Sequence, residues 1–266
     1  MMEIPLATDN MLAEVEGAIG WITFNKPARR NAVSLDMWEA IPAILDRFEA
    51  DPAVRVIVLK GAGDQAFVSG ADISEFEHAR SSPESTARYE QILDAANHRL
   101  IACPKPTIAM IRGFCIGGGV AIAIGCDLRI AEGASRFGIP AARLGLGYGA
   151  SGVRRLMELV GPAFTKEIFF TARHFSAAEA LEMGLVNRVV AADALEAYIR
   201  RYCDAIANNA PMTMLALKRT VAELARGTEA DLEACERLVR ACFDSEDYAE
   251  GRRAFMEKRR PVFRGA

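Results

Sequence analysis

The first half of the chain alternates between short β-prone runs and stretches whose apolar residues recur at helical spacing. Met11–Glu16 and Ile19–Phe24 are two such runs with Gly17 between them, a pattern that predicts a β-hairpin. After Ser34, a residue type favoured at helix N-termini, the apolar residues follow the period of an amphipathic helix. The apolar positions of that helix are Leu35, Trp38, Ile41, Ile44, Leu45 and Phe48.

The same alternation continues to about residue 137. Further strands are expected at Val54–Leu59, Pro106–Ile111 and Asp127–Ala131, with a helix over Pro83–Ala102 and a small-residue helix that starts at Gly117–Gly119. Strands that alternate with helices are typical of an α/β fold. The pattern therefore predicts the α/β class.

After Phe137 the periodicity becomes almost entirely helical. The expected helices are Gly152–Val160, Pro162–Ala172, Ala177–Met183, Ala192–Asn208, Pro211–Arg226, Asp231–Phe243 and Glu246–Arg260. No linker or low-complexity segment interrupts the chain. The simplest division is an α/β core over residues 1–195 and a helical region over residues 196–266.

Composition and charge exclude some classes of partner. The 266 residues are enough for one large core, and 51% of them are hydrophobic, as in ordinary soluble proteins. A net charge of −3 offers no long-range attraction to a polyanion, so no nucleic-acid partner is expected. The one basic cluster fits either a complement to a helix dipole or a phosphate-binding patch. It comprises Lys258, Arg259, Arg260 and Arg264.

The chain shows no targeting or membrane signal. The opening MMEIPLATDNML lacks the basic and apolar regions of a secretory leader, and no apolar run is long enough to span a membrane. Its six cysteines form no C-x-x-C pair and are expected to be reduced and partly buried. These features predict a cytoplasmic protein with no membrane partner.

Two further patterns bear on cofactor and metal binding. Gly147–Gly152 matches G-x-G-x-x-G, but no strand is expected before it and no strand with an acidic ribose partner after it. A tight loop packed under a helix is the favoured interpretation. His78, His98 and His174 are scattered along the chain, so no metal site is expected.

Two glycine-bearing loops indicate a site built from backbone. Ala66–Ile73 and Arg112–Gly119 each follow an expected strand. The amide of Gly118 would lie in the first turn of a helix, unpaired and at the positive end of its dipole. Two such amides converging from two loops would make an oxyanion hole. Close packing of a helix on a strand also requires glycine, and this alternative stays open.

Four segments resemble the crotonase (enoyl-CoA hydratase/isomerase) superfamily, in order and at its spacing. They are Phe67–Ile73 (FVSGADI), Gly113–Gly119 (GFCIGGG), Gly125–Ala131 (GCDLRIA) and Phe137–Pro140 (FGIP). The resemblance extends over nearly the whole chain. It implies an α/β fold with a crotonase-like spiral core of ββα units and a helical C-terminal trimerisation region.

The resemblance also implies roles for particular residues. The amides of Ala71 and Gly118 would hold the thioester oxygen of an acyl-CoA substrate as enolate charge develops. The coenzyme A belongs to the substrate, so no permanently bound cofactor is expected. The substrate path would be lined by Ala28, Arg30, Ser69, Gly70, Asp72, Ile73, Phe114 and Gly117. In a homotrimer, or a hexamer built as a dimer of trimers, Phe255 and Lys258 of a neighbouring subunit would cover the CoA.

The sequence departs from this family where its hydratases carry two glutamates. Those positions are Ala121 and Ala141, whose methyl groups cannot move a proton. On the loop over residues 145–151, only Tyr148 and Ser151 can relay a proton, and Tyr148 is the catalytic candidate. A second supply of polar groups follows the first glycine loop: Asp72, Glu75, Glu77 and His78.

The function expected from these observations is that of an acyl-CoA-processing enzyme of the enoyl-CoA hydratase/isomerase family with poor hydratase activity. The alternatives are another reaction of a CoA thioester (isomerisation, decarboxylation or hydrolysis) and a non-catalytic acyl-CoA-binding protein. The sequence does not indicate the acyl group.

Overall fold

The computed structural model describes residues 2–72, 74 and 82–266, which form two β-sheets and a set of helices. The larger sheet has the strand order β1 (Met2–Glu3), β2 (Met11–Glu16), β3 (Ile19–Phe24), β4 (Val56–Gly61), β6 (Thr107–Ile111), β8 (Leu128–Glu132) and β11 (Arg188–Val190). The smaller sheet has the order β10 (Phe175–Ser176), β9 (Arg136–Gly138), β7 (Phe114–Ile116) and β5 (Ala66–Val68).

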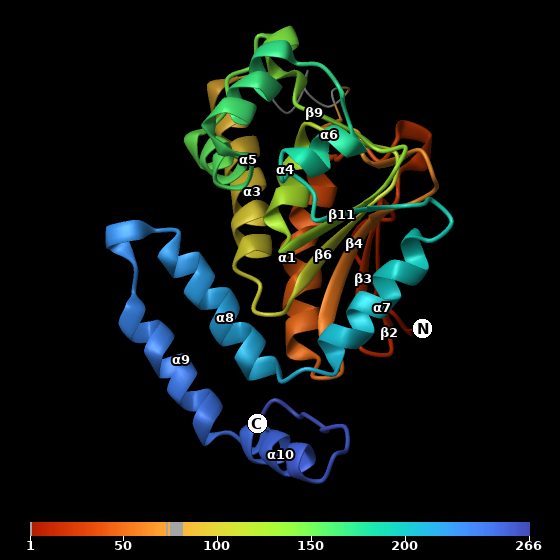
Figure 1. Cartoon of the computed structure of the whole chain (residues 1–266). Coiled ribbons are helices and arrows are strands. Elements are labelled where there is room, and N and C mark those ends of the chain that lie inside the picture. Colours follow the sequence, from red (N-terminus) through yellow and green to blue (C-terminus); the bar gives the residue numbers. More distant parts are fainter. Residues whose placement is uncertain (1, 73, 75–81) are drawn as a thin grey trace.

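The helices fall into two groups. Those that pack on the sheets are α1 (Leu35–Ala50), α3 (Pro83–Ile101), α4 (Gly118–Gly125), α5 (Ala150–Thr171), α6 (Ala177–Glu182) and α7 (Leu195–Ala207). The C-terminal helices α8 (Pro211–Leu224), α9 (Leu232–Asp244) and α10 (Glu246–Met256) extend away from them (Figure 1). Short 3-10 turns occur at η1 (Pro27–Arg29), η3 (Pro140–Leu144) and η4 (Gly227–Glu229).

From β4 to β9, consecutive strands alternate between the two sheets, and a helix follows each pair. The larger sheet receives β4, β6 and β8 as parallel neighbours, while β5, β7 and β9 pair in parallel in the smaller one. The helices α3, α4 and α5 follow the first, second and third pair. This repeat is the predicted spiral of ββα units, and the α/β class is confirmed.

The larger sheet is covered on both faces, which explains its continuous apolar strands. In β4, Ile57 and Leu59 belong to the core that α1, α3 and α4 complete. Val56 and Val58 alternate with them and face α7 on the other side. Figure 1 shows α7 separated from α1 by the sheet.

The smaller sheet determines where the two glycine loops lie. Strands β5 and β7 are parallel neighbours, with Ala66 opposite Phe114 and Val68 opposite Cys115. Because parallel strands end at the same edge of a sheet, the segments after Val68 and Ile116 begin side by side. The second segment leads directly into α4.

Some predicted boundaries were wrong. The region after residue 137 is not purely helical, because β10 pairs with β9 and β11 extends the larger sheet beside β8. The helix expected to reach Arg260 ends at Met256, where Lys258 turns into the left-handed region at φ +53°. By contrast, the two helices expected on either side of Gly161 are confirmed, because this glycine has non-helical dihedral angles (φ +75°, ψ 170°) at a kink within α5.

Other expectations can be compared with the structure directly. The six cysteines are unpaired, and Cys242 alone among them is not fully buried. Within the part of the chain that the structure describes, no helix is long and apolar enough to cross a membrane. The division into residues 1–195 and 196–266 stays a prediction; in the structure α7 packs on the larger sheet, and α8 is the first helix to leave it.

Arg129 carries a prediction about stability. Its guanidinium is buried at the C-terminal end of α4 and donates to the carbonyls of Cys126 and Leu185, each at 2.8 Å. Burial lowers the pKa of Arg129. We expect Arg129→Met to lower the free energy of unfolding by about 3–5 kcal/mol, because it leaves buried carbonyls without donors. Urea denaturation measures this, and a loss below about 1 kcal/mol would contradict it.

Candidate active site

The backbones of Ala71 and Gly118 lie next to each other. A β-carbon built on Gly118 would be 3.6 Å from the amide nitrogen of Ala71 and 3.5 Å from Cζ2 of Trp38. These are ordinary van der Waals distances, so a methyl group would fit there and would stand beside the Ala71 amide. The structure therefore brings together the two residues that the resemblance to the crotonase superfamily singled out.

The amide of Ala71 is turned away from its nearest backbone neighbour. Val33 donates to the carbonyl of Gly70 at 2.8 Å and accepts from the amide of Asp72 at 2.9 Å. Since N–H groups alternate in direction along an extended chain, the Ala71 amide between these two bonds points to the side opposite Val33. Val33 therefore does not use this amide.

The amide of Gly118 opens α4. The preceding Gly117 has φ +53°, a conformation that favours glycine, and its own amide donates to the carbonyl of Gly138 at 2.8 Å. The first N–H groups of an α-helix have no acceptor within the helix and lie at its positive end. Gly118 is half-buried, so its amide can meet a ligand.

The neighbouring glycine has a different purpose. A β-carbon on Gly119 would lie 2.3 Å from the carbonyl oxygen of Val68, inside any permitted contact. Gly119 therefore lets α4 pack directly on β5. The close-packing interpretation of the glycine motif thus holds at Gly119, and the role of the Gly118 amide stays a prediction.

The two positions where hydratases of the resembling family carry glutamate lie on α4 and on η3. Ala121 is half-buried in the first turn of α4, where its amide donates to Gly117. Ala141 is buried in η3. Neither side chain can accept or donate a proton.

Tyr148 is held by packing. Its ring is half-buried and lies edge-on to Phe169, with ring centres 5.0 Å apart. Burial raises the pKa of Tyr148 to about 12. The phenol therefore stays protonated over the physiological pH range, and it can donate a proton or a hydrogen bond but cannot act as a base.

Several residues predicted for the CoA path lie together beside the smaller sheet. The Arg30 guanidinium lies 5.2 Å from the centre of the Phe114 ring, and the Ser69 amide donates to the Arg30 carbonyl at 3.1 Å. Ala28 is exposed in the adjacent turn η1. His174, which the sequence had not connected with this surface, lies edge-on to Phe114 at 5.8 Å.

The remaining predicted residues divide into three cases. Ile73, Glu75, Glu77 and His78 lie outside the described residues. The carboxylate of Asp72 is already occupied by Lys26 and Ser74, so it is not free to relay a proton. Phe255 and Lys258 are exposed on or just after α10, beyond α8 and α9 and away from α4 in Figure 1. Within one chain these last two are not brought to the site.

The two cofactor patterns receive no support. The G-x-G-x-x-G segment is preceded by η3 and not by a strand. Among residues 2–72, 74 and 82–266, no three histidine, cysteine, aspartate or glutamate side chains are grouped so as to hold a metal ion.

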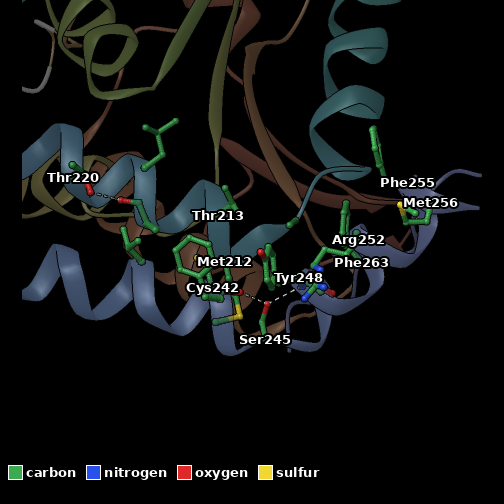
Figure 2. Close-up of a pocket in the computed structure, with 17 residues that line it drawn as sticks. Met212, Thr213, Thr220, Cys242, Ser245, Tyr248, Arg252, Phe255, Met256 and Phe263 are labelled. Carbon is green, nitrogen blue, oxygen red and sulfur yellow. Dashed lines mark hydrogen bonds between the residues drawn. The ribbon is translucent and has the colours of Figure 1, made fainter. Parts of the chain in front are cut away.

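A second concave surface, which sequence reasoning missed, lies between the C-terminal helices. It is a groove of about 980 Å³ between α8 on one side and α9 and α10 on the other (Figure 2). Its lining is mostly apolar and includes Met212, Leu217, Phe243, Phe255, Met256 and Phe263. Phe255 is 83% exposed, so this surface is uncovered in the single chain.

Comparisons with known proteins agree over nearly the full length. Residues 14–266 match the family model described as enoyl-CoA hydratase/isomerase. The chain is 35% identical to the short-chain-enoyl-CoA hydratase of Clostridium acetobutylicum, covering 95% of this chain and 96% of that protein. It is also 35% identical to the crotonyl-CoA hydratase of Syntrophomonas wolfei, with coverages of 97% and 99%.

Solved structures give the same result. The crystal structure of an enoyl-CoA hydratase/carnithine racemase from Magnetospirillum magneticum matches with a TM-score of 0.92 at 36% identity, covering 98% of this chain and 97% of that one. A putative enoyl-CoA hydratase/isomerase family protein from Hyphomonas neptunium matches with a TM-score of 0.92 at 37% identity, with coverages of 96% and 97%.

Proposed function

Because the chain belongs to the enoyl-CoA hydratase/isomerase family of acyl-CoA enzymes, we propose that it stabilises a thioester enolate between the amides of Ala71 and Gly118. The observation that supports this most directly is the 3.6 Å between the Ala71 nitrogen and the β-carbon position of Gly118. Both amides donate to the thioester oxygen, which gains negative charge as the enolate forms. One such donor is worth about 2.7–4 kcal/mol of barrier.

The reaction in this proposal relies little on acid–base side chains. Ala121 and Ala141 supply no carboxyl group, and Asp72 is held by Lys26. Decarboxylation of a malonyl-type thioester fits these conditions best among the alternatives. The bond between Cα and the carboxylate carbon breaks and CO₂ leaves. The electron pair of that bond forms the enolate, and one proton then adds to Cα.

The test is a panel of thioesters analysed by mass spectrometry, comprising crotonyl-, 3-enoyl-, malonyl-type and 3-oxoacyl-CoA. We expect turnover of a substrate that forms an enolate, with the malonyl type converted fastest and crotonyl-CoA hydrated very slowly. Binding of these thioesters without turnover of any of them would replace the enzyme with an acyl-CoA-binding protein.

Tyr148 is the proposed proton donor to the enolate carbon. With a pKa of about 12 it remains protonated, so we expect the rate to show no loss assignable to phenol ionisation below about pH 11. Tyr148→Phe should lower kcat by about 10²-fold, because it removes a general acid while keeping the ring. Steady-state kinetics on the substrate found in the panel measures this. Full activity in the variant would remove Tyr148 from the proton path.

The groove between α8, α9 and α10 supports a homotrimer or a dimer of trimers. Exposed Leu217, Phe243 and Met256 form an apolar surface of the kind that subunit interfaces cover (Figure 2). In the assembly, Phe255 and Lys258 would reach the CoA of a neighbouring subunit. We expect light scattering to show a trimer or hexamer, and Phe243→Asp to shift it to smaller species. A monomeric wild type would contradict the assembly.

A further inference from the structure

The segment that carries Arg30 and the segment that carries Ala71 form one hydrogen-bonded unit. The Ser69 amide donates to the Arg30 carbonyl at 3.1 Å, and Val33 pairs with the backbone on both sides of Ala71. Ala28 and Arg30 are predicted to line the CoA path, and we assign them to its nucleotide end because the exposed Arg30 guanidinium can pair with phosphate. The nucleotide side and the oxyanion side of the site are therefore joined by backbone contacts.

Lys26 and Asp72 close this unit with an ion pair. Lys26 Nζ lies 2.7 Å from Asp72 Oδ2, and the other carboxylate oxygen accepts from the Ser74 amide and hydroxyl at 3.1 and 2.6 Å. Burial raises the pKa of Asp72, but the hydrogen bonds from Lys26 and Ser74 outweigh it and bring the pKa to about 2. Asp72 is only 6% exposed, so its side of this contact is buried.

Lys26 itself is part of the nucleotide-side turn. Its carbonyl accepts from the amides of Arg29 and Asn31 at 2.9 and 3.0 Å, and its amide donates to Asn31 Oδ1 at 3.0 Å. Asn31 is fully buried and also donates to the carbonyls of Ala62 and Ala66. A ligand bound against this turn therefore also contacts the hydrogen-bonded unit that includes the backbone of Lys26.

We propose that Lys26 and Asp72 are positioning residues that transmit binding of the CoA nucleotide to the Ala71 amide. The inference rests on the proposed enolate function. Asp72 is one peptide bond from that amide, so the pair determines where the N–H points when the turn over residues 26–31 is held by ligand. Binding energy from the remote end of the substrate is thereby used at the reacting carbonyl. A donor misplaced by 1 Å can cost about 10²-fold in rate.

The test uses two ligands that differ only in the nucleotide, acetoacetyl-CoA and acetoacetyl-pantetheine, whose enolates absorb in the near ultraviolet. The apparent pKa of each bound ligand reports oxyanion stabilisation without any turnover. In the wild type we expect acetoacetyl-CoA to ionise at lower pH than the pantetheine ester. In Lys26→Met and in Asp72→Asn, the ionisation constant of bound acetoacetyl-CoA should fall about tenfold, while that of the pantetheine ester stays unchanged.

Three controls distinguish positioning from general support of the fold. Lys26→Arg keeps the charge and should keep the difference between the two ligands. The double variant should lose no more than either single variant, since both remove the same contact. Arg200→Met breaks an ion pair with Glu16, at 3.0 Å between α7 and β2, and should leave both ligands unaffected.

The outcomes separate this inference from the function on which it rests. If the wild type stabilises neither enolate, the proposed function is wrong. If it stabilises both equally, or if the difference survives in Lys26→Met and Asp72→Asn, the positioning role is wrong. Variants that lower stabilisation of both ligands alike would show a merely structural pair. Thermal melts of each variant confirm that the folded protein is being compared.

Discussion

Gly118→Pro should fold normally and lose about 10²–10³-fold of the rate on the enzyme's substrate. Gly118 is the first residue of α4, a position where proline is well tolerated because no intrahelical bond is lost. Proline has no N–H, so the substitution removes one of the two proposed donors. A β-carbon at Gly118 would make only ordinary contacts, the nearest at 3.5 Å.

The adjacent glycine provides a matched comparison. Gly119→Ala places a methyl group 2.3 Å from the Val68 carbonyl and should lower the free energy of unfolding by several kcal/mol, since backbone must move. The pair therefore separates catalysis from stability: activity loss with a normal melting temperature at position 118, and a lowered melting temperature at position 119. Unchanged turnover in Gly118→Pro would rule out the oxyanion role.

The largest gain is expected from restoring both carboxyl groups in Ala121→Glu/Ala141→Glu. A positioned acid or base contributes about 10²–10⁴-fold, so the double variant should hydrate crotonyl-CoA at least about 10²-fold faster than the wild type. Position 121 is half-buried and position 141 buried, so the second carboxyl would be desolvated and its pKa raised, which suits a general acid.

Glutamine at both positions is the control for this gain. Ala121→Gln/Ala141→Gln adds similar volume without a titratable group and should leave hydration at the wild-type level. Formation of 3-hydroxybutyryl-CoA, followed by mass spectrometry, measures all three proteins. An equal gain in the glutamine variant, or wild-type hydration already as fast as that of the double glutamate variant, would show that the alanines do not limit the reaction.

Periodicity predicted the long elements well because each buries a continuous apolar face. The residues Trp38 and Phe48 are fully buried in α1 as expected, while Leu35 at its start is only half-buried. The strands β1, β5, β7, β9, β10 and β11 were missed because two or three residues are too few to show any period. Their pairing depends on other strands of the fold, as β10 pairs with β9 and β11 with β8, which lie far away in sequence.

The candidate site was likewise predicted only in part. The glycine pattern predicted a role for Gly118, the resemblance added Ala71, and the parallel pairing of β5 with β7 explains why they meet. No sequence pattern indicated Val33 beside Ala71, or Lys26 on Asp72, because these contacts join residues about 40 positions apart. It therefore suggested Asp72 as a free polar group, whereas its carboxylate is fully engaged.

The packing of Gly119 on Val68, next to the proposed donor Gly118, bears on how an enzyme of this kind can change its reaction during evolution. The proposed donors are peptide groups, so no exchange of a side chain at Ala71 other than to proline deletes its N–H. The close contact at Gly119 holds the start of α4 against β5. Substitutions at positions 121, 141 and 148 change side chains without deleting either proposed N–H group. The proposed oxyanion donors are thus backbone groups, whereas acid–base groups are side chains. Side-chain substitutions can therefore change the reaction without removing the oxyanion site.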